Sequence, residues 1–296
     1  MAVIALASIA STGVTSSALA LTLASPRPSL LAECDPKGGT LRAGFLRGQI
    51  SAGFGLYHLA AAERVSPDAM ANAFASHLWP LDEGGHRKLM PGLTDAAQAA
   101  SLGRTWSALS DVLHVLAQEA GHDVYVDAGR LSFTSGQLHE TLTPAPLIHQ
   151  ADLVLLVVRN TEPSLALTRH VIDPLRAELD ERGNGSSALA LLVIERETSR
   201  GGHGYTTHQI ADALKTPVLG ALPWDAPVAD YFTEGGTPPR GYSRSDLLRY
   251  ARTAAEHLAV VAQRRRVQQQ FPAPAAHAQL AGLLQRLNPQ RGAARG

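Results

Sequence analysis

The stretch that decides the fold is Val3–Ala24, which reads VIALASIASTGVTSSALALTLA. It opens with a short apolar run, as expected of a strand that is buried on both faces. The middle part, Ser8–Ser17, is rich in Ser and Thr and contains Gly13, which is typical of a turn that leads into a helix. Apolar residues then return at Ala18–Ala24. The pattern predicts a strand over Val3–Ser8, a loop and a helix over Ala18–Ala24.

The same stretch has some features of a secretory signal peptide. Residues 1–26 contain no charged side chain, and Ala18 and Ala20 have the spacing of a cleavage site. However, a signal peptide needs a positively charged start, which is missing here, and polar residues interrupt the apolar run. We therefore expect this segment to belong to the folded protein. The alternative is an exported α/β protein from which residues 1–24 are removed.

Outside this stretch, short apolar segments alternate with longer segments of helical period. This alternation predicts an α/β fold, with a mostly parallel twisted sheet covered by helices on both faces. The further strands that we expect are Ser29–Glu33, Arg87–Met90, Val124–Asp127, Leu153–Val158, Leu189–Glu195 and Val218–Leu222. Three apolar stripes indicate helices, and they consist of Trp106, Leu109, Leu113 and Leu116; Val171, Ile172, Leu175 and Leu179; and Leu247, Ala251, Leu258 and Val261.

Composition and charge exclude several classes of protein. The chain has 296 residues, of which 45% are hydrophobic, so wholesale disorder is excluded. The 26 basic residues balance the 26 acidic ones, so no global charge favours a nucleic-acid partner. Cys34 is the single cysteine, which excludes an internal disulfide and a multi-cysteine zinc site. The histidines lack metalloprotease spacing, and no Gly-x-Ser-x-Gly motif is present.

The C-terminal region differs in composition from the rest. We expect the main domain to cover residues 1–267, with its last helix ending near Gln263, and a Pro/Ala/Arg-rich tail to cover 268–296. Within 275–296 a short amphipathic helix is expected, with its apolar stripe beside Arg286 and formed by Leu280, Leu283, Leu284 and Leu287. This helix either docks on its own domain or binds a membrane surface or a protein partner.

Polar residues follow several of the expected strands, at the edge where open α/β sheets bind their ligands. The loop Gly13–Ser17 runs into a helix, and backbone N–H groups at a helix start attract anions. Glu33 and Asp35 follow the second strand, and Asp127 ends a later one. Because Mg²⁺ is held by one or two carboxylates together with phosphate oxygens, these residues indicate a site for magnesium and a nucleotide.

The ordered series of segments resembles the ParA/MinD group of deviant-Walker P-loop ATPases, which belong to the SIMIBI class. The resemblance extends from Ala2 to about Gln263, and it implies a three-layered P-loop NTPase-like fold that binds ATP and Mg²⁺. Its segments are Gly13-Val14-Thr15-Ser16-Ser17, Leu30-Leu31-Ala32-Glu33-Cys34-Asp35-Pro36, Asp123-Val124-Tyr125-Val126-Asp127, Ala151–Val158 and Pro217–Asp225.

The resemblance also assigns roles to single residues. Gly13, Val14, Thr15, Ser16 and Ser17 correspond to the family's phosphate loop. Within that loop, the hydroxyl of Ser17 takes the place of the family's Mg²⁺ ligand.

Three carboxylates complete the set that the resemblance assigns. Asp127 corresponds to an acid that ends a strand of the family's sheet and is, with Ser17, a candidate Mg²⁺ ligand. Glu33 and Asp35 correspond to the family's paired aspartates, which makes Asp35 and Asp127 the candidate catalytic residues and Glu33 a candidate nucleotide contact.

The phosphate loop departs from the family pattern at the positions that bear charge. The family motif Lys-Gly-Gly-Val-Gly-Lys-Thr-Thr is replaced by residues 11–18, so both lysines become serines, Ser11 and Ser16, and Thr15 replaces a glycine. A charge-assisted hydrogen bond contributes about 1.5–3 kcal/mol. Two lost lysines therefore predict a roughly 10²- to 10⁴-fold weaker interaction with phosphate or with the transition state.

Two functions remain open on these residues. The first is a catalytically impaired scaffold or regulator that positions partners in partitioning, polar positioning or secretion-system assembly. The second is an active, atypical ATPase in which Lys37, Arg42 or Arg130 takes over the lysine's role. Both imply a protein partner and allow a homodimer, and both imply a cytoplasmic protein, peripheral to the membrane if the tail binds lipid.

The sequence also predicts the character of three other segments. Lys37-Gly38-Gly39-Thr40 looks like a phosphate loop, but it follows an Asp-Pro turn and is expected to be an ordinary turn. The loop 201–208 is expected to connect two elements, with Thr206 or Thr207 capping the next helix. The segment 130–150 corresponds to a switch region of the family or is a long surface loop.

Overall fold

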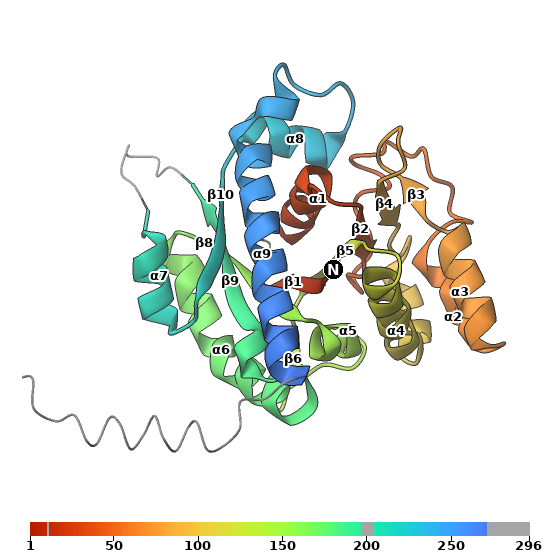
Figure 1. The fold of residues 1–296 in the computed structure, drawn as a ribbon, viewed down its shortest axis with the longest axis horizontal. Coiled ribbons are helices and arrows are strands. Elements are labelled where there is room, and N and C mark those ends of the chain that lie inside the picture. The colour runs from red at the N-terminus through yellow and green to blue at the C-terminus, as the bar shows by residue number, and fades with distance from the viewer. Residues whose placement is uncertain (11, 197–203, 271–296) are drawn as a thin grey trace, which may run out of the picture.

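The computed structural model describes residues 1–10, 12–196 and 204–270. Within these residues the chain forms an eight-stranded sheet in the order β10-β9-β8-β1-β5-β2-β4-β3 (Figure 1). The pairs are parallel except for the antiparallel pair of β3 and β4 at one edge. The strands are β1 (Val3–Ser8), β2 (Ser29–Glu33), β3 (Trp79–Pro80), β4 (Arg87–Met90), β5 (Asp123–Arg130), β8 (Leu153–Arg159), β9 (Leu189–Glu195) and β10 (Val218–Pro223).

Helices cover both faces of the sheet, and a small hairpin lies outside it. The hairpin consists of β6 (Phe133–Thr134) and β7 (Gln137–Leu138). The helices are α1 (Val14–Ala24), α2 (Leu59–Glu63), α3 (Pro67–Ser76), α4 (Thr105–Gln118), α5 (Ala145–Gln150), α6 (Glu162–Arg182), α7 (Thr207–Leu214), α8 (Ala226–Glu234) and α9 (Asp246–Gln270). Short 3₁₀ turns lie at Leu56–His58, Ala96–Leu102, Ser186–Ala188 and Tyr242–Arg244.

The central strand β1 shows how the two faces are built. Its side chains alternate, because successive residues of a strand point to opposite faces. Val3, Ala5 and Ala7 belong to the core that α4, α5, α6 and α7 cover, whereas Ile4 and Leu6 belong to the core beneath α1, α8 and α9. The predicted three-layered α/β fold is thus confirmed, and the described residues include no helix long and apolar enough to cross a membrane.

Two helix boundaries differ from the sequence prediction. Helix α1 starts at Val14 rather than Ala18, because the hydroxyl and the amide of Ser17 both donate to the carbonyl of Gly13 and close the first turn. Helix α9 continues beyond Gln263 to Gln270. Its last turns are held because the guanidinium of Arg265 donates to the carbonyls of Asp152 and Asn184.

The structure gives more detail for two predicted segments, and other predicted features lie outside the described residues. The segment 130–150 is not one continuous loop, since it contains the hairpin β6–β7 and helix α5. Thr206 caps α7, as expected, and its hydroxyl accepts from the amide of Gln209. Ser11, residues 197–203 and the amphipathic segment of 275–296 lie outside the described residues.

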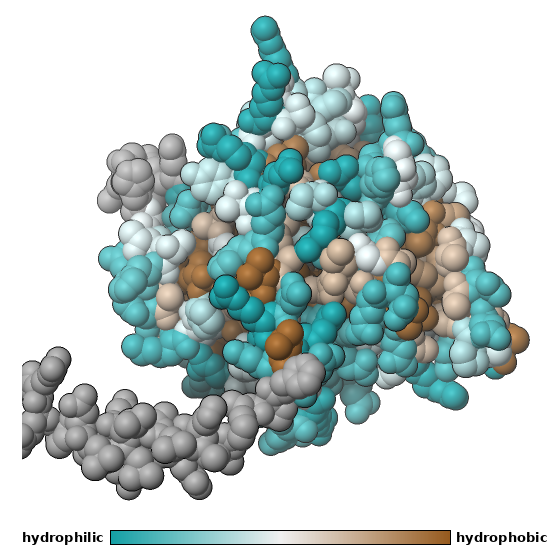
Figure 2. Space-filling model, viewed as in Figure 1, coloured by the Kyte–Doolittle hydropathy of each residue, from teal (hydrophilic) through white to brown (hydrophobic). Residues whose placement is uncertain are grey.

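The surface of the face seen in Figure 2 is mainly hydrophilic, with hydrophobic residues in separate groups between hydrophilic ones. Helix α9 crosses this face in Figure 1. Its exposed hydrophobic residues include Val260 and Val267, which are 47% and 50% exposed. They lie beside Gln263 and Arg264 along a shallow depression.

Candidate functional site

The loop between β1 and α1 forms the floor of the candidate site. Gly13 is the residue before α1 and has φ of +92°, a left-handed conformation that glycine adopts without strain. Nothing lies within 4 Å of the position that a Cβ would take there, so the space above the loop is open. The neighbouring Thr12 fixes the loop to the sheet, because its hydroxyl donates to the carbonyl of Val157 in β8 at 2.9 Å.

An open cavity of about 560 Å³ lies above this loop. Of the predicted site residues, Gly13, Val14, Thr15, Ser16 and Asp35 line it. Ser17 instead lines a smaller adjoining cavity of about 120 Å³, which also contains Gly13 and Ser16 in its wall. The start of α1 therefore faces an accessible space, and the binding of phosphate by Gly13–Ser17 stays a prediction.

Three basic side chains from three separate segments also line the larger cavity. They are Lys37, which follows β2, Arg130 at the end of β5 and Arg159 at the end of β8. Arg42, the third cation that the sequence suggested, is occupied elsewhere, since its guanidinium donates to the carbonyls of Ile50, Ser51 and Phe54. Arg159 was missed, although it directly follows an apolar strand, the same signal that identified Asp127.

Asp127 lies beneath the loop and is fully buried. Its carboxylate accepts a 2.5 Å hydrogen bond from the hydroxyl of Thr15 and a 3.0 Å hydrogen bond from the amide of Gly129. Burial raises its pKa from 3.8 to about 7, and the nearby carboxylates of Glu33 and Asp35 add to this rise, while the two hydrogen bonds oppose it. Asp127 does not line the cavity; it connects the end of β5 to the first turn of α1.

Glu33 is also buried, but it is bound by backbone rather than by a side chain. Its carboxylate accepts from the amides of Thr40, Leu41 and Gly92 at 2.6, 3.0 and 2.9 Å. Desolvation raises the pKa of Glu33, and these three hydrogen bonds oppose the rise. The turn at 37–40 is thus wrapped around Glu33, and Gly39 is needed there because a Cβ would lie 2.5 Å from its Oε2.

Asp35 lies nearer to solvent, at the wall of the cavity. It accepts from the amide of Lys37 at 2.8 Å. Partial burial raises its pKa, and Lys37 and Arg130 oppose the rise. Its carboxyl packs on the backbone of Gly129, where a Cβ would lie 2.1 Å from Cγ of Asp35. Of the three predicted carboxylates, Asp35 is the one that lines the cavity.

The two predicted Mg²⁺ ligands, Ser17 and Asp127, take part in hydrogen bonds within the chain. The hydroxyl of Ser17 donates to the carbonyl of Gly13 at 2.8 Å, and both carboxylate oxygens of Asp127 already accept hydrogen bonds. In the described residues no group of three or more His, Cys, Asp and Glu side chains is arranged for a metal ion. Both predicted Mg²⁺ ligands therefore already fix the start of α1 through hydrogen bonds, Ser17 as a donor and Asp127 as an acceptor.

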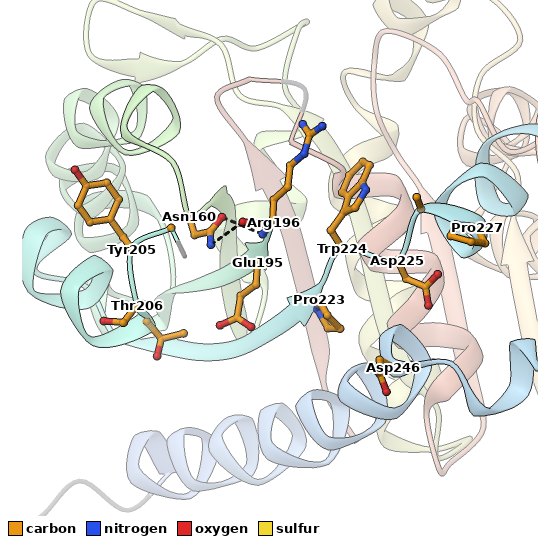
Figure 3. Close-up of a pocket in the computed structure, with 13 residues that line it drawn as sticks. Asn160, Glu195, Arg196, Tyr205, Thr206, Pro223, Trp224, Asp225, Pro227 and Asp246 are labelled. Carbon is orange, nitrogen blue, oxygen red and sulfur yellow. Dashed lines mark hydrogen bonds between the residues drawn. The ribbon is translucent and has the colours of Figure 1, made fainter. Parts of the chain in front are cut away.

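A larger groove of about 910 Å³ lies beside the loop, at the carboxyl ends of β8, β9 and β10 (Figure 3). Asn160 joins two of these ends, because its amide group accepts from the nitrogen and donates to the carbonyl of Arg196. The guanidinium of Arg196 lies 5.2 Å from the ring centre of Trp224. Glu195 and Asp225 also line the groove.

The groove and the phosphate-loop cavity are connected through shared walls. Trp224 and Asp225 line both the groove and the 120 Å³ cavity, and Arg159 lines both that cavity and the 560 Å³ one. The three cavities therefore adjoin one another between the start of α1 and Trp224. The sequence included Pro217–Asp225 in the family resemblance but did not assign a site there.

Comparison with known proteins supports the fold assignment. No protein family model matches the sequence, and no curated protein matches it. Among solved structures, the chain is similar to the septum site-determining protein MinD of Pyrococcus horikoshii complexed with Mg-ADP, with a TM-score of 0.62 and 16% identity over 90% of this chain and 99% of that one.

Two further structures extend this likeness. A variant of Cyanothece McdA in complex with ATP has a TM-score of 0.62 at 16% identity, covering 88% of this chain and 96% of its own. The MinC:MinD cell division protein complex of Aquifex aeolicus has a TM-score of 0.57 at 17% identity, covering 87% and 96%. The resemblance to the ParA/MinD group is thus confirmed at the level of the fold.

Proposed function

We propose, from the fold that this chain shares with MinD and McdA, that it is a ParA/MinD-like nucleotide-binding protein with impaired hydrolysis. In this proposal it acts as a scaffold or regulator that positions a protein partner in partitioning, polar positioning or secretion-system assembly. The ligand is a nucleotide whose phosphates lie at Gly13–Ser17 and whose base lies toward Trp224. We place the protein in the cytoplasm.

One observation carries the proposal: the loop has the open shape of a phosphate loop without its lysines. Gly13 leads into α1 beneath a 560 Å³ cavity, as an anion site at a helix start requires. At the position of the family's second lysine, Ser16 lines that cavity with a neutral hydroxyl. Because catalysis of phosphoryl transfer rests on positioning and charge stabilisation, a neutral group there favours binding over turnover.

The test is an ATP titration combined with a phosphate-release assay on the full chain. We expect measurable binding with little or no release of phosphate. Ser16→Lys, combined with Ser11→Lys and Thr15→Gly, is expected to raise ATP affinity by roughly 10²- to 10⁴-fold, the value of two charge-assisted hydrogen bonds. Ser76→Lys, at an exposed position of α3, serves as the matched control. No gain in the triple variant would mean that the loop does not hold phosphate.

A second candidate is an active, atypical ATPase of the same group. The positions of Lys37, Arg130 and Arg159 around the cavity favour it, since cations placed there could stabilise charge on a phosphoryl group. Turnover that disappears in Asp127→Ala and persists in Asp173→Ala would reject the impaired enzyme and support this candidate. Asp173 is a suitable control because its side chain is 86% exposed.

The third reading, export with removal of residues 1–24, conflicts with the position of these residues in the fold. They form β1, the strand between β5 and β8, and helix α1. A cleaved chain would lose the middle of its sheet. Mass determination of the natural N-terminus tests this directly, because an intact start excludes cleavage.

The partner remains part of the proposal. The MinD structure of Aquifex aeolicus was solved in a complex with MinC, and we infer that this chain also binds a protein, with a homodimer as the simplest further assembly. We assign the contact with a partner or a membrane surface to residues 275–296. Deleting 271–296 is expected to abolish cosedimentation with the partner or with anionic liposomes and to leave the thermal midpoint nearly unchanged. Unchanged sedimentation would rule out this role.

A further inference from the structure

The residues that the fold implies as metal ligands make other contacts in this chain. Both carboxylate oxygens of Asp127 accept hydrogen bonds, one from Thr15 and one from Gly129. The hydroxyl of Ser17 donates to the carbonyl of Gly13. A divalent ion that approached Oδ2 of Asp127 from the side of α1 would have to displace the 2.5 Å contact that Thr15 makes there.

Thr15 makes the connection that a metal ion would otherwise make. It stands in the first turn of α1, and Asp127 stands in β5, so their hydrogen bond joins the helix start to the strand. The contact is made by a hydroxyl that a glycine at this position would lack. Thr15, which replaces a glycine of the family motif, is therefore the residue that donates a hydrogen bond to the carboxylate of Asp127.

Side chains of the protein itself place positive charge around the cavity, where a bound metal ion would otherwise supply it. Lys37 is one of three lysines in the sequence, and it lines the same cavity as Arg130 and Arg159. The three side chains belong to different segments, after β2, β5 and β8, and face one space above the start of the 11-residue helix α1. Together with the helix N-terminus they can neutralise the charge of a polyphosphate, a role that Mg²⁺ shares in most nucleotide sites.

We propose that this site binds the polyphosphate of its ligand without Mg²⁺, with Lys37, Arg130 and Arg159 in place of the ion and Thr15 in place of its contact with Asp127. This inference rests on the proposed function and specifies its ligand as the metal-free polyphosphate. It also separates the role of Asp127 from metal binding, since the carboxylate anchors α1 to the sheet.

The experiment measures the affinity of the full chain for ATP and for inorganic tripolyphosphate, each in excess Mg²⁺ and in excess chelator. We expect both ligands to bind at least as tightly in chelator as in Mg²⁺. Arg159→Gln and Lys37→Met are each expected to weaken binding about tenfold in chelator. Arg104→Gln, at an exposed position outside the cavity lining, should leave it unchanged.

Thr15→Val and Thr15→Gly test the role of the hydroxyl. Both remove the hydrogen bond to Asp127, and the valine variant keeps the branched shape of the side chain. We expect ATP binding in these variants to become stronger in Mg²⁺ than in chelator, because Asp127 is then released for the ion. Two variants are used, so that the test can still be made if one of them does not fold.

The outcomes separate this inference from the proposed function. ATP binding that weakens tenfold or more when Mg²⁺ is removed from the unaltered chain would overturn the inference and leave the nucleotide function standing. Tripolyphosphate binding in chelator without ATP binding would support the inference and overturn the nucleotide function. Absence of binding by either ligand in both conditions would overturn both.

Discussion

Strand β5 contains two buried aspartates, Asp123 at its amino end and Asp127 in its carboxyl half, and they have different kinds of partner. At the amino end, Asp123 is 1% exposed and pairs with Arg27, whose Nε and Nη2 donate to its two oxygens at 2.8 and 3.0 Å. In the carboxyl half, Asp127 is also fully buried, but its oxygens accept from a hydroxyl and an amide. The same residue type in one strand thus has an ionic partner at one edge of the sheet and neutral partners at the other.

The same difference in the partners of buried acids is found elsewhere along the amino and carboxyl edges of the sheet. At the amino edge, Asp152 pairs with Arg266, so the charges there neutralise one another within the fold. At the carboxyl edge, Glu33 is bound by three amides, and the cations Lys37, Arg130 and Arg159 line a cavity. The acids at the amino edge therefore have ionic partners within the fold, whereas Asp127 and Glu33 accept hydrogen bonds from uncharged groups beside a cavity that cations line.

The largest effect is expected from breaking the pair at the amino end. Arg27→Ala would leave the carboxylate of Asp123 buried without a counter-ion, and this should lower the free energy of unfolding by about 3–5 kcal/mol. Urea denaturation measures it. Arg249→Ala is the control, because its ion pair with Asp246 is 65% exposed on both sides and should contribute less than about 0.5 kcal/mol. Equal effects of the two variants would contradict an essential role for this pair.

The second effect concerns Asp127 and has the opposite sign. Because its pKa is raised from 3.8 to about 7, the folded protein keeps a proton there that the unfolded chain releases. The free energy of unfolding of the unaltered protein should therefore fall as the pH rises from about 3.8 to about 7. Asp127→Asn removes this loss, so the variant should gain up to about 3 kcal/mol relative to the parent between about pH 5 and about pH 7.

Denaturation curves at several pH values measure this relative gain, and Asp173→Asn, with a side chain that is 86% exposed, is the control. A difference between Asp127→Asn and its parent that does not change with pH would show that Asp127 is ionised throughout the window. In that case Asp127 would resemble Asp123 in its need for a positive partner.

The sequence predicted the sheet well because its strands are buried on both faces and therefore stand out as apolar runs, as in Leu153–Val158. It also brought Gly13–Ser17 and the three carboxylates to one edge, since that follows from parallel strand order alone. It did not predict which groups face the cavity. That depends on contacts between distant segments, such as Thr15 with Asp127 or Gly39 with Glu33, which no local pattern encodes.

The same limit explains the choice among cations. Lys37, Arg42 and Arg130 were the cations nearest to the site in sequence, yet Arg42 donates to the carbonyls of residues 50, 51 and 54. The predicted start of α1 was wrong for a related reason. Ser and Thr at 15–17 favour a cap over a helix interior, but the hydrogen bonds of Ser17 and Thr15 allow α1 to begin at Val14.

The third effect concerns Glu33, which, like Asp123 and Asp127, is a buried acid at the sheet. Three amides converge on its two oxygens, so Glu33→Gln would place an NH₂ group against at least one N–H donor. We expect a loss of about 2 kcal/mol in the free energy of unfolding, the cost of a buried unsatisfied donor. Glu181→Gln, on the exposed side of α6, is the matched control. Unchanged stability would mean that the turn at 37–40 does not depend on Glu33.

The smallest effect is expected at the amino edge, where Asp152 has two kinds of partner. Its Oδ2 accepts from the amide of Val3 at 2.8 Å and from Nη2 of Arg266 at 2.7 Å. Arg266→Gln removes the second partner only, and the side chain of Arg266 is 25% exposed. The loss in the free energy of unfolding should therefore stay below about 1 kcal/mol, well under that of Arg27→Ala.

Urea denaturation of the two variants side by side measures this ranking. A loss in Arg266→Gln as large as that in Arg27→Ala would mean that the amide of Val3 contributes little and that the amino edge depends on its arginines throughout. The expected smaller loss would instead show that the ionic partner matters most where the backbone offers no substitute. Asp123 meets that condition, because its carboxylate accepts from the side chains of Arg27 and Ser25.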